Sequence, residues 1–123
     1  MEIARERAES NVVRAWEPGR VRIGSQWVDG HVIISAERII EGWDVDAADA
    51  IGFDALRPAI DLRPEIILVG TGAEILLPNV ELMRQLAAES IGIETMTTPA
   101  ACRTFNVLLN EQRRVVVALF NPR

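Results

Sequence analysis

The sequence EIILVG, residues 65–70, decides the fold, because it is a continuous apolar run bounded by turn residues. Such a run is typical of a strand that is buried on both faces of a sheet. Two further segments have the same character, namely IGIETM at residues 91–96 and RRVVVALF at residues 113–120. We therefore expect three strands in the C-terminal half of the chain.

A helical pattern separates the first two of these strands. The sequence PNVELMRQLAAES, residues 78–90, places Leu82, Met83 and Leu86 on one face at helical spacing. Pro78 suits the start of such a helix, and Gly92 is a candidate for the residue that terminates it. The pattern therefore predicts a helix between the first two strands.

A second helical pattern, TPAACRTFNVLLN, follows at residues 98–110. Thr98 is a good N-cap, and Pro99 then occupies the first helical position. The order strand, helix, strand, helix, strand indicates parallel strands joined by right-handed crossovers. The final strand is long and apolar, so we expect it to be central in the sheet or covered by another subunit, which leaves a homo-oligomer open.

The segment from residue 11 to residue 43 has a different rhythm, in which short apolar runs alternate with turn signals. Pro18 and Gly19 mark one turn, and the Asp29–Gly30 pair between two apolar runs predicts a hairpin. We expect an antiparallel meander of four or five strands here, followed by a short helix around residues 50–56. The predicted fold class is α/β: this meander joined to the βαβαβ unit in one compact layered domain.

Domain organisation follows from length and composition. The chain has 123 residues, and we expect a single α/β domain over residues 11–123, preceded by a polar, poorly ordered segment at residues 1–10. The formal net charge is -5, which argues against a nucleic-acid partner. No apolar run approaches the ~20 residues of a membrane span. A single cysteine suits a reducing compartment, so we expect a cytoplasmic protein.

The residues available for catalysis are few. All 13 positive charges are arginines, there is no tyrosine, and the chain has one histidine and one cysteine. The absence of lysine excludes Schiff-base chemistry and a Walker-type phosphate lysine. An acidic cluster, Asp44, Asp46 and Asp49, lacks the spacing of a calcium loop, so a solvated loop is favoured. We expect no cofactor and no metal.

A candidate crevice lies where two parallel strands end, because ligands of open α/β sheets collect at the carboxyl ends of the strands. These ends are residues 70–74 and residues 96–102. Both lead toward helix N-termini, which favour anions. The candidate ligand-binding residues of this crevice are Gly70, Thr71, Gly72, Thr97, Thr98, Cys102, Arg103 and Asn106.

Each feature of the crevice also has a purely structural interpretation. Gly70 and Gly72 match only part of a dinucleotide fingerprint, and a glycine turn after the strand is the favoured explanation. Cys102 near a helix N-terminus could be a reactive thiol. Helical spacing also places it with Phe105 and Leu109 on one face, which favours a buried cysteine that packs like a small hydrophobe.

Two segments resemble a known family: ILVGTG at residues 67–72 and IGIETMTTPAACRTFNVLLNEQRRVVVALF at residues 91–120. They are similar to the domain-of-unknown-function family that includes mitochondrial respiratory complex I assembly factor 3, and the chain resembles a bacterial member. The resemblance runs from about residue 12 to residue 120. The matching positions are Gly70, Thr71, Gly72, Thr98, Ala101, Asn106, Leu109 and Arg114. Thr97 and Phe105 depart from it, because bacterial relatives commonly carry aspartate and tyrosine there.

The resemblance implies a compact α/β fold and a role in assembling a respiratory membrane complex. Two functional hypotheses follow. The first is a non-enzymatic assembly or interaction factor with a protein partner, which the small stock of catalytic groups favours. The alternative is a small-ligand-binding protein or an uncharacterised enzyme that uses the crevice at the strand ends.

Overall fold

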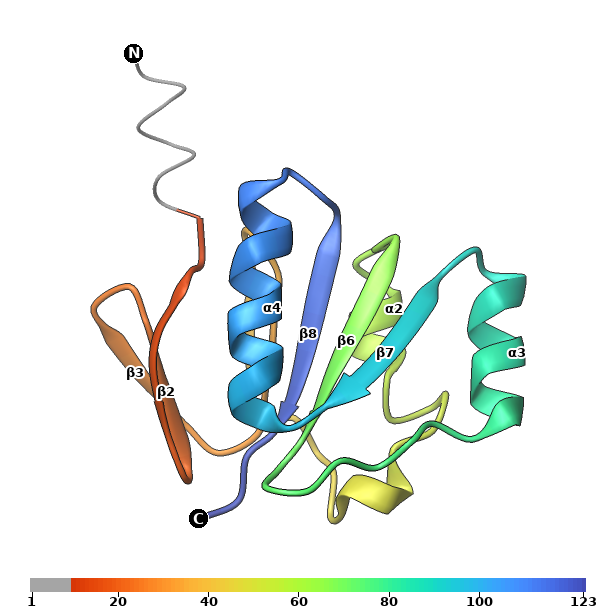
Figure 1. Ribbon diagram of the computed structural model, residues 1–123, viewed down its shortest axis with the longest axis horizontal. Coiled ribbons are helices and arrows are strands. Elements are labelled where there is room, and N and C mark those ends of the chain that lie inside the picture. Colours follow the sequence, from red (N-terminus) through yellow and green to blue (C-terminus); the bar gives the residue numbers. More distant parts are fainter. Residues whose placement is uncertain (1–9) are drawn as a thin grey trace.

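The computed structural model describes residues 10–123 and contains two sheets with helices packed around the larger one (Figure 1). The predicted polar segment at residues 1–10 lies outside the described residues, apart from Ser10. The α/β class expected from the sequence is confirmed. The helices and strands begin and end close to the predicted positions in the C-terminal half, and they differ more in the N-terminal half.

The larger sheet has five strands in the order β5-β4-β8-β6-β7. Its parallel part consists of β6 (Ile66–Thr71), β7 (Gly92–Met96) and β8 (Val115–Phe120). Two antiparallel strands, β4 (Val32–Ile34) and β5 (Ile39–Glu41), extend it beyond β8. The long apolar strand β8 therefore lies in the centre of the sheet, between β4 and β6. This is one of the two arrangements that were expected for it.

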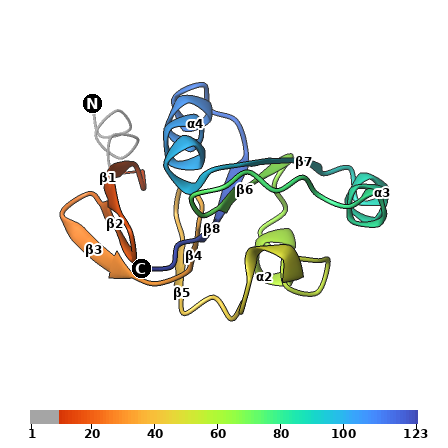
Figure 2. The ribbon, with the colours of Figure 1, turned by 60° about the horizontal axis from the view of Figure 1, so that its bottom comes forward.

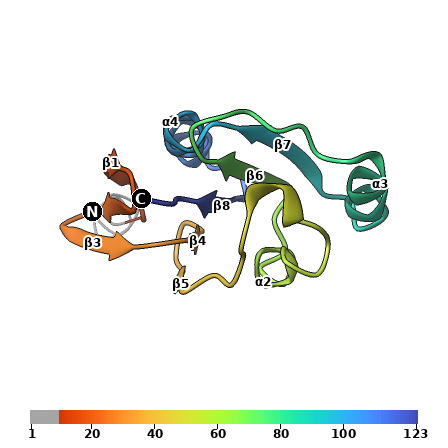
Figure 3. The same cartoon turned by 90° about the horizontal axis from the view of Figure 1, so that it is seen from below.

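One long helix covers one face of this sheet, a short helix lies on the opposite face, and the second long helix lies beside the edge strand β7 (Figure 3). Helix α4 (Thr98–Asn110) buries Ala101, Cys102 and Phe105 against one face. Helix α3 (Val80–Ala88) and the short helix α2 (Arg57–Ile60) contribute to the core of the other face. Alternate residues of β6 and β8 supply both cores, which is why these strands read as continuous apolar runs.

The three remaining strands, β1 (Val13–Glu17), β2 (Arg20–Ile23) and β3 (Gln26–Asp29), form a separate antiparallel sheet. Figure 2 shows this sheet beside α4, and the two share one apolar core. In β2 and β3 the residues that point toward this core are buried, as Val21 and Val28 show. The predicted meander therefore has five strands, but they are divided between two sheets.

The hairpin predicted at Asp29–Gly30 is wrong. Strand β3 pairs only with β2, while β4 pairs with β5 and β8. All three residues of β4 are buried, so pairing within the larger sheet buries both of its faces. Two-residue hairpin turns lie instead between Glu17 and Arg20, at the predicted Pro18–Gly19 turn, and between Ile23 and Gln26, where Gly24 adopts a φ of +60°.

Three helix boundaries also differ from the prediction. In place of a helix at residues 50–56, the chain forms a 3-10 turn, η1 (Ala48–Ala50), and then α2. Ser90, with a φ of 61°, ends α3, while Gly92 begins β7. The N-cap of α4 is Thr97, whose hydroxyl accepts a hydrogen bond from the Ala100 N–H, so Thr98 is free for another role.

Candidate functional site

The predicted crevice lies where β6 ends and α4 begins, and Thr98 fills much of it. The Thr98 side chain is fully buried. Its Oγ1 accepts a hydrogen bond from the Gly72 N–H at 2.8 Å and donates one to the Phe120 carbonyl at 2.6 Å. A Cβ added to Gly70 would lie 2.9 Å from the Thr98 Cα, so helix and strand already touch. The structure thus brings Gly70, Gly72 and Thr98 together in close packing.

The other predicted residues have separate environments. Asn106 binds the backbone of Val13 twice at 2.9 Å, because its Oδ1 accepts from the N–H and its Nδ2 donates to the carbonyl. The Thr71 hydroxyl contacts the Met96 carbonyl at 3.1 Å. Arg103 is exposed on α4. These contacts join structural elements to one another, and a ligand-binding role for the eight residues stays a prediction.

Cys102 is buried against the sheet, with 4% of its surface exposed. Burial raises the pKa of its thiol to about 12, and the opposing effect of the Arg103 charge is smaller. At neutral pH the thiol therefore stays protonated and is a poor nucleophile. The environment matches the structural interpretation of this cysteine.

His31 belongs to a network that joins the small sheet to the end of β8. Its Nδ1 accepts a hydrogen bond from the Asn121 N–H at 2.9 Å, and its ring stacks on Phe120 at 4.6 Å. The Asn121 side chain in turn accepts from the Trp16 Nε1 at 3.0 Å. Burial lowers the pKa of His31, which keeps Nδ1 available as an acceptor.

A pocket of about 190 Å³ lies on the α3 side of the sheet, on the other face from the predicted crevice residues of α4. Most of the residues that line it are apolar, with Asp49 and Thr95 among the polar ones. The apolar lining residues are Ala48, Ile51, Val69, Leu76, Leu77, Pro78, Leu82 and Ile93. Thr71 is the one predicted crevice residue that borders this pocket.

Beside the pocket, large apolar side chains face solvent. We call these five residues the docking surface: Ile75, Leu76, Leu77, Val80 and Met83. Leu77 is 84% exposed and Val80 is 69% exposed. Leu76 and Leu77 also line the pocket, so the apolar surface continues into it.

The local sequence explains how this surface arises. Asn79 caps α3, since its Oδ1 accepts from the Leu82 N–H at 2.6 Å. With the helix started there, Leu82 and Leu86 pack into the core, while Val80 and Met83 lie on a second stripe that faces outward. Met83 was expected on the buried face, and this expectation is wrong.

Sequence reasoning did not identify the docking surface, although a signal for it exists. Ile75, Leu76 and Leu77 are consecutive apolar residues between a strand and a helix cap, so neither element accounts for them. A run of exposed apolar residues is costly unless it has a function. The run could therefore have indicated an interaction site.

Within residues 10–123, no group of three or more histidine, cysteine or acidic side chains could hold a metal ion. In the same part of the chain, no helix has the length and apolar character needed to cross a membrane.

The sequence matches a protein family and several individual proteins, and the fold matches solved structures. The family described as "Protein of unknown function (DUF498/DUF598)" matches residues 13–120. A protein named "13 kDa major membrane protein" from Francisella tularensis subsp. holarctica is 38% identical over 85 residues, which are 68% of this chain and 69% of that protein. NADH dehydrogenase (ubiquinone) 1 alpha subcomplex assembly factor 3 from Danio rerio is 29% identical over 120 residues, covering 96% of this chain and 68% of the relative.

A crystal structure of a Bordetella parapertussis protein has the same fold. Its TM-score is 0.84 at 36% sequence identity, and the match covers 91% of this chain and 96% of that one.

Proposed function

The chain belongs to the family of proteins of unknown function DUF498/DUF598, and from this membership we propose that it is a non-enzymatic interaction or assembly factor. A relative in Danio rerio is named an assembly factor of NADH dehydrogenase, which supports a protein partner for this chain too. We extend this to a finer proposal, that the partner is a component of a respiratory membrane complex. That step is an inference from family membership.

One observation carries the proposal, namely the docking surface. Five large apolar side chains face solvent between β6 and the middle of α3. Scattered exposed apolar residues are normal, but a clustered group next to a pocket is typical of protein interaction sites. Burying such side chains against a partner removes apolar area from water, which is the main favourable term in protein association.

The size of the pocket favours a protein partner over a free small ligand. Pockets for drug-sized ligands span roughly 300–1,000 Å³. The pocket beside the docking surface measures about 190 Å³, which suits a single large side chain. An anchor residue in a small, desolvated pocket is a common centre of a protein interface.

The small-ligand or enzymatic alternative has less support. It requires the crevice at the strand ends, where Thr98 packs against Gly70. It also gains little from Cys102, because burial raises the pKa of that thiol to about 12. We therefore prefer the interaction role.

The compartment is a further part of the proposal. We propose the cytoplasm, with contact to a membrane complex made through the partner. A relative in Francisella tularensis is named a membrane protein, so cell fractionation is a necessary test. Recovery in the soluble fraction after a salt wash supports a peripheral association, and retention in the membrane after that wash contradicts it.

The experiment for the interaction role is a pull-down from native cell extract. The tagged wild type is compared with the double variant Leu77→Ser, Val80→Ser and with the control Val107→Ser. Val107 is also apolar and 55% exposed, but it lies on α4, which covers the other face of the sheet. We expect a partner that the wild type and the control recover and the double variant loses. Equal recovery by all three proteins would contradict the proposal.

A further inference from the structure

We propose that the docking surface takes a partner segment with one large apolar side chain flanked by arginine or lysine residues. This inference rests on the proposed function and specifies the chemistry of the partner. The large side chain would enter the pocket, and the basic residues would face the acidic groups around it.

The charge of the two segments that border the pocket supports this choice. Residues 44–56 contribute Ala48, Asp49 and Ile51 to the pocket, and residues 72–83 contribute Leu76, Leu77 and Asn79. The two segments together contain six acidic residues, four in the first and two in the second. Neither segment contains a basic residue. The six are Asp44, Asp46, Asp49, Asp54, Glu74 and Glu81.

Two of these acids already have basic neighbours. Glu81 pairs with Arg84 at 2.8 Å, and Asp54 lies 3.9 Å from Arg57. In the part of the chain that the structure describes, Asp44, Asp46, Asp49 and Glu74 form no ion pair within 4.0 Å. Within residues 10–123, these four carboxylates therefore have no basic partner.

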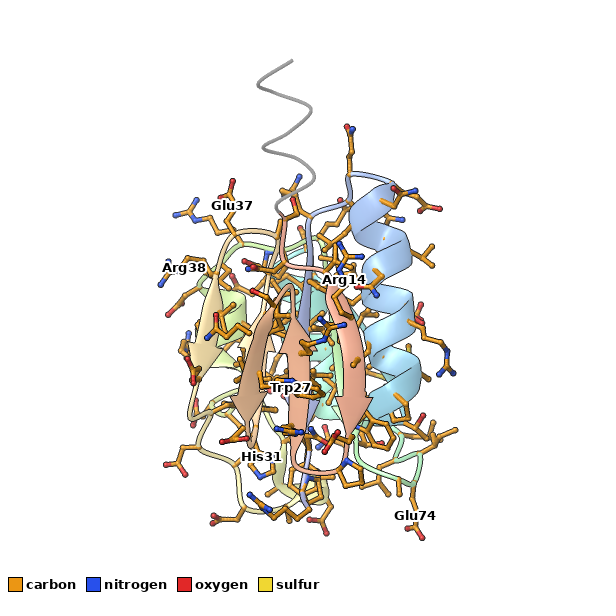
Figure 4. All side chains as sticks on the ribbon, turned by 90° about the vertical axis from the view of Figure 1, so that its left-hand side faces the viewer. Arg14, Trp27, His31, Glu37, Arg38 and Glu74 are labelled. Carbon is orange, nitrogen blue, oxygen red and sulfur yellow. The ribbon has the colours of Figure 1, made fainter. Side chains whose placement is uncertain are left out.

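The positions of two acids are informative. Asp49 lines the pocket itself. Glu74 directly precedes the apolar run of the docking surface, and Figure 4 shows its side chain projecting away from the ribbon. Together they place negative charge at the pocket and at the start of the surface, so a partner with basic residues next to its apolar anchor is complementary.

Electrostatic physics explains why basic flanks would matter. Opposite charges near a protein surface attract over about the Debye length, ~8–10 Å at physiological salt. Such attraction raises the association rate and disfavours acidic partners. The net charge of -5 adds to both effects. The apolar anchor supplies the affinity, and the acidic rim supplies the selectivity.

The test is a selection from a random-peptide phage library on the immobilised full chain. Phage that also bind the Leu77→Ser protein are removed first, so that the remaining peptides depend on the docking surface. We expect the enriched peptides to share one leucine, isoleucine, methionine or phenylalanine with arginine or lysine on either side. A synthetic peptide of the enriched sequence then provides a direct affinity measurement.

Charge variants test the acidic rim separately from the apolar surface. We expect the double variant Asp49→Asn, Glu74→Gln to bind the enriched peptide roughly three- to tenfold more weakly, and added salt to weaken the wild type more than the variant. The matched control is Glu37→Gln, an exposed acid on the β4–β5 turn that borders neither the docking surface nor its pocket. We expect this control to bind as the wild type does.

The outcomes separate this inference from the proposed function. Enriched peptides that need Leu77 but carry no basic residues would overturn the inference and leave the interaction role standing. If no enriched peptide depends on Leu77, both are overturned. Sedimentation of the free protein tests whether a second copy of the chain binds the docking surface. A dimer that the Leu77→Ser substitution dissociates would show this, and it would also overturn the inference.

Discussion

The Thr98 hydroxyl donates a 2.6 Å hydrogen bond to the carbonyl oxygen of Phe120. The Thr98 hydroxyl oxygen itself accepts a hydrogen bond from the Gly72 N–H at 2.8 Å, so one side chain of α4 joins the ends of β6 and β8. The residue that resembled a helix cap in the sequence therefore has a tertiary role. This relationship explains why the predicted crevice is packed.

Replacing Thr98 with valine should destabilise the fold. The change keeps the shape but leaves the Gly72 N–H and the Phe120 carbonyl without their partner, and each unsatisfied buried group costs about 1–3 kcal/mol. Because two groups lose their partner, we expect the free energy of unfolding to fall by at least about 2 kcal/mol in chemical denaturation, with Thr98→Ser closer to the wild type. A Thr98→Val protein as stable as the wild type would contradict this role.

Replacing Gly70 with alanine should also be destabilising, through overpacking. The new Cβ would lie 2.9 Å from the Thr98 Cα, which is backbone and cannot move cheaply. Overpacking of this kind costs about 1–3 kcal/mol. Gly52→Ala is the control, because nothing lies within 4 Å of a Cβ there. Thermal unfolding should show a lower Tm for Gly70→Ala only, and equal effects would disprove the steric argument.

The sequence predicted the fold correctly where a pattern within a single helix or strand was enough to place that element. The central place of β8 follows from its six consecutive apolar residues, since only a strand buried on both faces can hold them. Asp29–Gly30 misled, because turn chemistry says that the chain reverses locally and does not say which strands pair. The pairing was decided by the burial of β4 between β5 and β8.

The candidate site was harder to predict than the fold. Thr98, Cys102 and Asn106 have side chains that can do chemistry, which is why the sequence suggested a function for them. Their environments are set by contacts distant in sequence, such as the one between Val13 and Asn106, which are 93 positions apart. Conversely, Ile75–Leu77 looked unremarkable because apolar residues are expected to be buried. Only the three-dimensional structure shows that these side chains face solvent.

The stability of the protein should fall at mildly acidic pH because of His31. Burial lowers its pKa below the ordinary value of 6.5, so the unfolded chain takes up the proton at a higher pH than the folded protein does. The stability that neutral His31 contributes is fully present above the pKa of this histidine in the unfolded chain. It is lost as the pH falls through the lower pKa of the folded protein. Protonation of Nδ1 would also break the bond from the Asn121 N–H.

We therefore expect the Tm of the wild type to decrease between about pH 7.5 and about pH 5.5, where histidine titrates. His31→Gln, which retains a side-chain acceptor but does not titrate, should show a smaller decrease over the same window. Differential scanning calorimetry measures both. Identical slopes for the two proteins would rule His31 out as the cause.

Cys102 should be unreactive in the folded protein. A rise of its pKa from 9.0 to about 12 lowers the thiolate fraction at neutral pH roughly a thousandfold, and burial also limits access. We expect iodoacetamide to label the native protein far more slowly than a free thiol, and to label it readily in denaturant. Labelling of the native protein at the rate of a free thiol would contradict this and would support an enzyme that uses the Cys102 thiol.

The central claim is that the docking surface binds a protein partner, and the affinity of the recovered partner tests it most directly. Isothermal titration calorimetry would compare the wild type, Leu77→Ser and the matched surface variant Val107→Ser. We predict at least a roughly tenfold weaker Kd for Leu77→Ser, as expected for an interface anchor, and an unchanged Kd for Val107→Ser. The same Kd for all three proteins would contradict the account.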